Sequence, residues 1–248
     1  PNEAQLARVM VRRLKSDLVD AEGKKLYPER RLEALNVEYS VEEREARALL
    51  EQYVASRETQ DERGGAASHF VHQLLRKRLA SSPAAFVSTL ARHTATIESE
   101  GKVRRTSGLD ERILRRAIAK TEEDYADDET REAAESEAIE EASRRLRPPS
   151  VEEKKLLGRL RSWAEQASHK PDSKAAALLR WLEENLRTKG QWSTARVILF
   201  TEYRATQKWL HEILASHDLG GERLALLFGG MDPKERETIK AAFQADPR

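Results

Sequence analysis

Two short apolar runs near the end of this 248-residue chain restrict its fold more than any other feature. Arg196–Thr201 reads Arg-Val-Ile-Leu-Phe-Thr, and Leu224–Phe228 reads Leu-Ala-Leu-Leu-Phe. Continuous apolar runs of this length are typical of strands that are buried on both faces. A helical pattern follows each run, with Trp209, Leu210, Ile213 and Leu214 after the first and Ile239, Ala242 and Phe243 after the second. Because strand–helix–strand–helix with short connections builds a parallel sheet, we predict a mixed α/β fold.

The middle of the chain, from about residue 40 to 170, has helical periodicity. Ser40 with Glu43 and Ser150 with Glu153 have the spacing of capping boxes, and Ser82-Pro83 has the pattern of a helix start. A content of 35% charged and 6% aromatic residues also favours long, solvated helices. We predict helix over 110–145, either continuous or interrupted by an acidic loop, and a further helix over 150–167. The fold is therefore expected to be helix-dominated.

The first forty residues contain an apolar and basic stretch over 9–17, a turn near Gly23, and a short strand indicated by alternating Leu35, Val37 and Tyr39. The chain has no cysteine, which excludes disulfides, thiol nucleophiles and Cys-ligated zinc, and fits a reducing, cytoplasmic compartment. No run reaches the length of about 18 apolar residues that a membrane span needs, so no membrane partner is expected.

Charge is segregated along a chain whose net charge is only +1. Residues 64–120 carry eleven basic and four acidic side chains, whereas residues 121–143 carry eleven acidic side chains and one basic. Such blocks are usually solvated helix faces or flexible loops. The alternative interpretation is a basic surface for a phosphate backbone beside a partly disordered acidic stretch.

The sequence contains no catalytic apparatus of its own. A phosphate-binding G-x-x-x-x-G-K-[ST] motif is absent, and so is a D-E-x-H acid pair. His69 and His72 are three residues apart on a helix but have no evident third metal ligand, and His93 on an apolar stripe is better explained as a core residue.

Two loops have the shape of ligand-binding loops, because ligands of open parallel sheets bind where strands end and helices begin. These loops are Thr201–Arg204 and Gly229–Asp232. Arg236 shares a helical stripe with Ile239 and Phe243, an unusual place for a cation in a first helical turn. Its head group either extends to solvent past a packed stem or binds an anion.

Several segments, taken in order, resemble the Swi/Snf-type ATPases of helicase superfamily 2, with the bacterial RapA/HepA-like branch closest. Residues 9–17 resemble the segment that leaves the first motor lobe, and 32–53 the strand and helix after it. Residues 75–83 resemble a segment between the lobes. Residues 172–186 resemble the lysine-led helix that opens the second lobe, and 196–206 are similar to helicase motif IV. Residues 228–231, with Glu235, Arg236 and Phe243, are similar to the glycine-led segment that follows.

The resemblance covers about half of the chain and implies three parts. Residues 1–40 would be the end of the first lobe and the hinge, 41–170 a helical insertion between lobes, and 171–248 the first half of a truncated RecA-like parallel α/β lobe. Residues 94–170 match no motif of the family. The Walker lysine, the magnesium-binding acids and the arginine finger would lie outside the chain. ATP and Mg²⁺ are then cofactors of a longer parent protein, and we expect neither tight ATP binding nor hydrolysis by this chain alone.

By the same resemblance, the parent protein would translocate along double-stranded DNA. The backbone contacts would come from Thr201, Arg204, Gly230, Met231 and Arg236, with Arg76 and Arg78 extending the track. Residues at the hinge or between the lobes would be Arg12, Arg13, Lys15 and Lys174. RNA polymerase or another protein is a further partner that the resemblance allows. The alternative is a helical protein-interaction or nucleic-acid-binding regulatory module without ATPase activity.

Overall fold

The computed structural model describes residues 15–60, 65–99, 108–121, 127–188 and 190–246, together with 123 and 125. These residues divide into two compact units, one ending at Asn36 and the other beginning at Val37. In the first unit, a 3-10 helix over Lys15–Asp17 precedes a turn at Gly23, and Val19 forms an isolated antiparallel bridge with Lys25. The turn predicted near Gly23 is confirmed.

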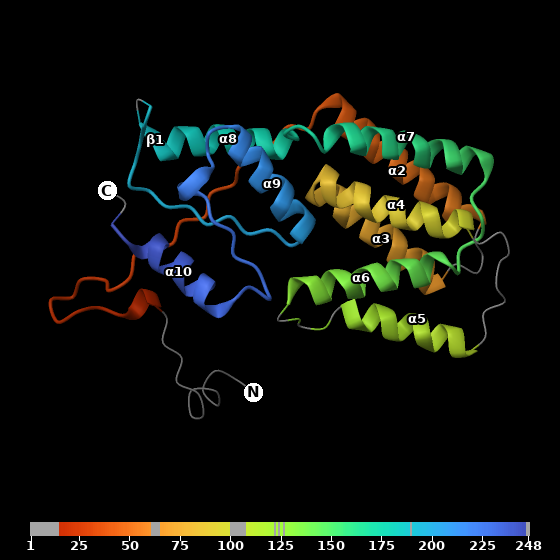
Figure 1. Cartoon of the computed structure of the whole chain (residues 1–248), viewed down its shortest axis with the longest axis horizontal. Coiled ribbons are helices and arrows are strands. Elements are labelled where there is room, and N and C mark those ends of the chain that lie inside the picture. Colours follow the sequence, from red (N-terminus) through yellow and green to blue (C-terminus); the bar gives the residue numbers. More distant parts are fainter. Residues whose placement is uncertain are drawn as a thin grey trace. The chain divides into compact units, whose positions relative to one another are not determined.

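The second unit is dominated by helices, as predicted (Figure 1). The α-helices among the described residues are α2 (Val41–Gln60), α3 (Gly65–Ser81), α4 (Pro83–Ser99), α5 (Gly108–Thr121), α6 (Asp128–Ser143), α7 (Val151–Ala167), α8 (Ser173–Leu186), α9 (Arg204–Ser216) and α10 (Pro233–Gln244). The acidic block is interrupted between α5 and α6, so the alternative with a loop inside it is the correct one.

Capping side chains set the helix starts that the sequence indicates. At α2, the Ser40 N–H donates to Glu43 over 2.7 Å while the Glu43 N–H donates to the Ser40 hydroxyl over 3.2 Å. Ser150 and Glu153 form the same reciprocal pair at α7. The Ser82 hydroxyl accepts from the Ala85 N–H at the start of α4. All three predicted caps are therefore confirmed, because each satisfies backbone donors that a helix start leaves free.

The main hydrophobic core lies among the helices between residues 41 and 167. Leu50 and Tyr53 of α2, Leu75 of α3, Phe86 of α4 and Leu157 of α7 are almost fully buried in it. Two smaller clusters join α8 to α9, one around Trp209 and Ile213 and the other around Leu182, Leu214 and Leu219. The residues after 171 thus have small cores of their own.

The two buried parallel strands expected at 196–201 and 224–228 are not formed. Both segments are irregular and unpaired, and the sheet within the described part of the chain is a hairpin of β1 (Arg187–Thr188) and β2 (Gln191–Trp192). Val197 and Leu224 pack against the α8–α9 cluster, whereas Ile198 is 60% and Phe200 91% exposed. The apolar pattern indicates a buried strand, but no neighbouring strand supplies hydrogen bonds and no layer covers the outer side chains.

The short strand predicted over Leu35–Tyr39 is also absent. This segment is irregular, and Leu35 is 52% and Tyr39 45% exposed. Alternating polar and apolar residues form a strand only where a partner strand pairs with the backbone, and none lies beside this segment among the residues described.

Candidate functional site

The loops at the ends of the two extended runs lie next to each other. The Arg204 guanidinium, at the start of α9, stacks 3.6 Å above the ring centroid of Phe228. The Gln207 amide donates to the Leu227 carbonyl over 2.8 Å, and Arg236 of α10 donates to the Phe228 carbonyl over 3.3 Å. Two of the cations predicted to bind phosphate therefore converge on Phe228, the first residue of the segment 228–232, which we call the glycine loop.

The glycine loop itself contacts the N-terminal end of α6. The Gly229 N–H donates to the Asp128 carboxylate over 2.8 Å. Gly230 has φ of +83°, and a Cβ added to it would lie 2.4 Å from Oδ1 of Asp127. Asp127 is also the N-cap of α6 and accepts from the N–H groups of Glu129 and Thr130. A side chain at position 230 would be strained by its backbone conformation and blocked by Asp127.

A second group of contacts ties α6 and α3 to the other loop. Arg78 is 4% exposed, forms an ion pair with Glu135 of α6, and lies 3.8 Å above the ring centroid of Tyr203. Arg131 lies 3.6 Å from Glu202 and 3.5 Å from Glu135. Burial raises the pKa of Tyr203 to about 12, and the charge of Glu202 adds to the rise, so the phenol stays neutral at physiological pH.

These contacts assign different surroundings to the predicted DNA-binding residues. Thr201, Arg204 and Arg236 are partly exposed, whereas Met231 is 8% exposed. Arg76 faces solvent on α3 and donates to both carboxylate oxygens of Glu51, over 2.6 to 3.3 Å. Arg78 lies two residues after Arg76 on the same helix, but its side chain points into the protein. Its guanidinium is occupied by Glu135 and does not face solvent.

Lys174 lies at a joint between the residues after 171 and the corner between α3 and α4. Its ammonium donates to the carbonyl oxygens of Ala80 and, over 2.6 Å, of Ser81, where α3 ends. The Thr206 hydroxyl at the start of α9 lies 2.7 Å from that of Ser81 and 2.8 Å from that of Ser82. A cation at free carbonyls favours a helix C-terminus, so Lys174 stabilises the end of α3.

The remaining residues of the predicted hinge belong to the first unit. Lys15 lies 5.4 Å from the ring centroid of Tyr27. Arg12 and Arg13 lie outside the described residues.

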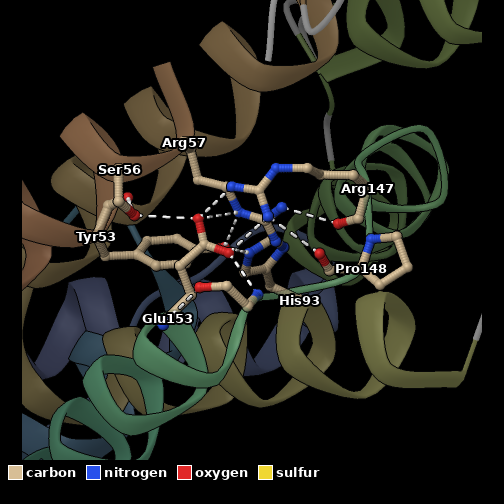
Figure 2. Close-up of polar contacts among 8 residues, drawn as sticks. Tyr53, Ser56, Arg57, His93, Arg147, Pro148 and Glu153 are labelled. Carbon is tan, nitrogen blue, oxygen red and sulfur yellow. Dashed lines mark hydrogen bonds and ion pairs between the residues drawn. The ribbon is translucent and has the colours of Figure 1, made fainter. Parts of the chain in front are cut away.

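A buried polar network lies in the main core and joins residues between 53 and 153, none of which belongs to these loops (Figure 2). Arg57 is 0% exposed and donates to the Tyr53 hydroxyl over 3.1 Å and to the Arg147 carbonyl over 2.8 Å. Glu153 is 1% exposed, lies 3.7 Å from Arg57 and accepts from Arg147 over 2.7 Å. The Tyr53 hydroxyl lies 2.6 Å from Nε2 of His93. The other ring nitrogen of His93, Nδ1, lies 2.8 Å from the Ser143 hydroxyl.

Charge states in this network are fixed by burial and by the neighbouring arginines. Burial alone would raise the pKa of Glu153, but hydrogen bonds from Arg147 and the Ser150 N–H, with the charge of Arg57, lower it to about 2. Burial lowers the pKa of His93 to about 3 and raises that of Tyr53 to about 12. His93 is therefore a neutral core residue, as predicted, whereas Nη2 of the buried Arg57 has no hydrogen-bond partner.

The loops differ from the network in what they can bind. They offer backbone N–H groups and partly exposed guanidinium groups, which suit phosphate oxygens, whereas the side chains of Arg57, Glu153 and His93 in the network are buried in the main core. No cluster of side chains suited to a metal ion, and no helix long and apolar enough to cross a membrane, occurs within the described ranges.

The sequence indicated the two loops but missed their acidic partners. The role of Asp127, Asp128 and Glu135 was hidden in a block interpreted as solvated or disordered. The stripe of Ala134, Ala138 and Ile139, which buries one face of α6, is the signal that this block packs. Protein-family models, curated proteins and solved structures were compared with the chain, and none of them matches it.

Proposed function

We propose that residues 171–248 are the DNA-gripping first part of a RecA-like second motor lobe, in a Swi/Snf-type protein that translocates on double-stranded DNA. Residues 41–170 are then the helical insertion between the lobes. ATP and Mg²⁺ act in the parent protein, at residues that this chain does not contain. The loops at 201–204 and 228–236 grip the phosphate backbone, which makes binding independent of base sequence.

The observation that carries the proposal is the convergence of Arg204 and Arg236 on Phe228. In an open parallel sheet, loops that follow successive strands meet at one edge, and ligands bind there. The loops meet in this way even though the preceding runs are unpaired. Lys174 and Thr206 support the proposal further, because they connect these residues to the α3–α4 corner and would transmit movement between the two parts.

Duplex binding tests the proposal directly. Affinity of the chain for a fluorescent 20-base-pair duplex of arbitrary sequence is measured by anisotropy at several salt concentrations. We expect Arg204→Ala and Arg236→Ala each to weaken binding equally for different sequences, and to reduce the salt slope by about one unit, because each removes a phosphate contact. The control is Arg159→Ala, which removes an exposed cation of α7. Equal effects of all three variants would contradict the proposal.

One observation favours a second candidate, a helical protein-interaction module without ATPase activity. Ile198 and Phe200 form an exposed apolar run, and such runs often contact other proteins. The full-length gene product separates the candidates. The translocase requires a Walker lysine upstream, and Arg204→Ala and Arg236→Ala should lower its DNA-stimulated ATP turnover while the fold is kept. The interaction module requires neither.

A further inference from the structure

The acidic end of α6 occupies the loop that the proposed function assigns to DNA. The Gly229 N–H, a donor of the kind that binds phosphate oxygen, is already bonded to the Asp128 carboxylate at 2.8 Å. A carboxylate and a phosphate diester both present anionic oxygens to such a donor, and charge-assisted hydrogen bonds of this type are strong. One N–H cannot serve both acceptors fully at once.

The fit between the loop and α6 is close over more than one residue. At Gly230, an added Cβ would collide with Oδ1 of Asp127, so the glycine loop lies against the acidic corner. The other loop is tied to the same helix, because Arg131 lies 3.6 Å from Glu202. Asp127, Asp128 and Glu202 therefore bring negative charge to the position where Arg204 and Arg236 would meet DNA.

We propose that Asp127 and Asp128 act as an internal substitute for a DNA phosphate, holding the glycine loop closed in this structure and reducing DNA binding until α6 moves away. The inference rests on the proposed function, because it assigns the same loop to DNA. It gives the acidic block a specific role, which is competition with DNA for the Gly229 N–H. An acid that merely repelled DNA from a distance would not need this contact.

The test compares two alanine variants with the same loss of charge in the same helical turn. Asp128→Ala removes the acceptor of the Gly229 N–H, whereas Glu129→Ala removes an exposed carboxylate of the first turn of α6. Each variant is measured alone and also in a double variant that carries Arg236→Ala. Affinity for the 20-base-pair duplex is measured as above, and circular dichroism verifies the helical content. We expect Asp128→Ala to bind about tenfold more tightly than Glu129→Ala. The slope of log affinity against log salt concentration should be steeper by about one unit, which corresponds to one additional phosphate contact.

Each outcome decides the question. A gain of Asp128→Ala over Glu129→Ala, in a variant that Arg236→Ala then weakens, supports the inference, because both changes act on DNA bound at the same loop. Equal affinity of Asp128→Ala and Glu129→Ala overturns it, and the proposed function still stands if Arg236→Ala weakens the Glu129→Ala variant. A gain with Asp128→Ala in a variant whose affinity Arg236→Ala leaves unchanged places the DNA elsewhere and overturns the inference. If no variant binds the duplex, the proposed function and the inference both fail.

Discussion

Glu153 shows how one side chain performs two structural tasks. Its backbone N–H and carboxylate complete the capping box of α7, and the same carboxylate balances two arginines inside the core. The first task is visible in the sequence as Ser150 three residues before an acid. The second is not, because Arg57 precedes Glu153 by 96 residues, and only the packing of α2 against α7 brings these two side chains together beside Arg147.

Glu153→Gln is expected to destabilise the fold strongly. Glutamine keeps the size of the side chain but leaves the buried Arg57 without its counter-charge, and breaking a buried ion pair in this way costs about 3–5 kcal/mol. Glu152→Gln is the control, since its exposed pair with Lys155 contributes about 0–1 kcal/mol. Urea unfolding followed by circular dichroism measures both. Similar losses for the two variants would show that Glu153 carries no special charge role.

The same residues predict how stability depends on pH. His93 has a pKa of about 3 in the folded state against 6.5 as its ordinary value, so the unfolded chain binds its proton first. Its contribution is fully present above pH 6.5 and is lost as pH falls toward 3, at up to about 1.4 kcal/mol per pH unit. Glu153 adds a second loss as pH falls from 4.5 to about 2.

Unfolding free energies of the wild type and His93→Gln between pH 7 and 5 isolate the histidine contribution. Arg57 and His72, which face His93, both disfavour its charged form. Because the pKa of His72 is itself lowered, to about 4, the variant should keep a reduced slope. A variant whose stability falls with pH as steeply as that of the wild type would contradict the assignment.

At the scale of elements, helices were predictable from the sequence and strands were not. A helix satisfies its own backbone, and caps such as Ser40–Glu43 and Ser82 mark its start locally. A strand needs a partner that the local sequence does not contain, so the apolar run at 196–201 indicates a strand that the structure does not form. The sequence also located the loops after the two runs, because each loop leads into a helix whose start is specified locally.

Lys174→Met is expected to loosen the joint between α8 and the α3–α4 corner without affecting the main core. The ammonium binds the carbonyls that end α3, and losing it costs about 0.5–2 kcal/mol, the range for a charge at a helix end. Hydrogen exchange should accelerate at the ends of α3 and the start of α8 but not in α2 or α7. The matched control is Lys154→Met, on the exposed face of α7. Uniform acceleration across all helices would contradict a local role.

At the scale of the whole molecule, the candidate site is assembled from three stretches distant in the sequence. Arg78 precedes Glu135 by 57 residues, and Asp128 precedes Gly229 by 101. The basic and acidic blocks are visible in the sequence, but their pairing depends on α6 packing between α3 and the loops. The sequence therefore identifies the cations and glycines of the site, and the structure adds the carboxylates of Glu135 and Asp128, which contact Arg78 and the Gly229 N–H.

The exposed run at 196–201 predicts self-association of the whole molecule. Phe200 is 91% exposed in a run whose backbone pairs with no strand among the described residues, and such a run can pair with a second copy. We expect light scattering after size exclusion to show a mass that rises with concentration, and Phe200→Ser to reduce the rise. Leu32→Ser is the control, because Leu32 is 90% exposed but lies outside the run. A constant monomer mass at high concentration, or an equal effect of both variants, would show that this edge does not drive association.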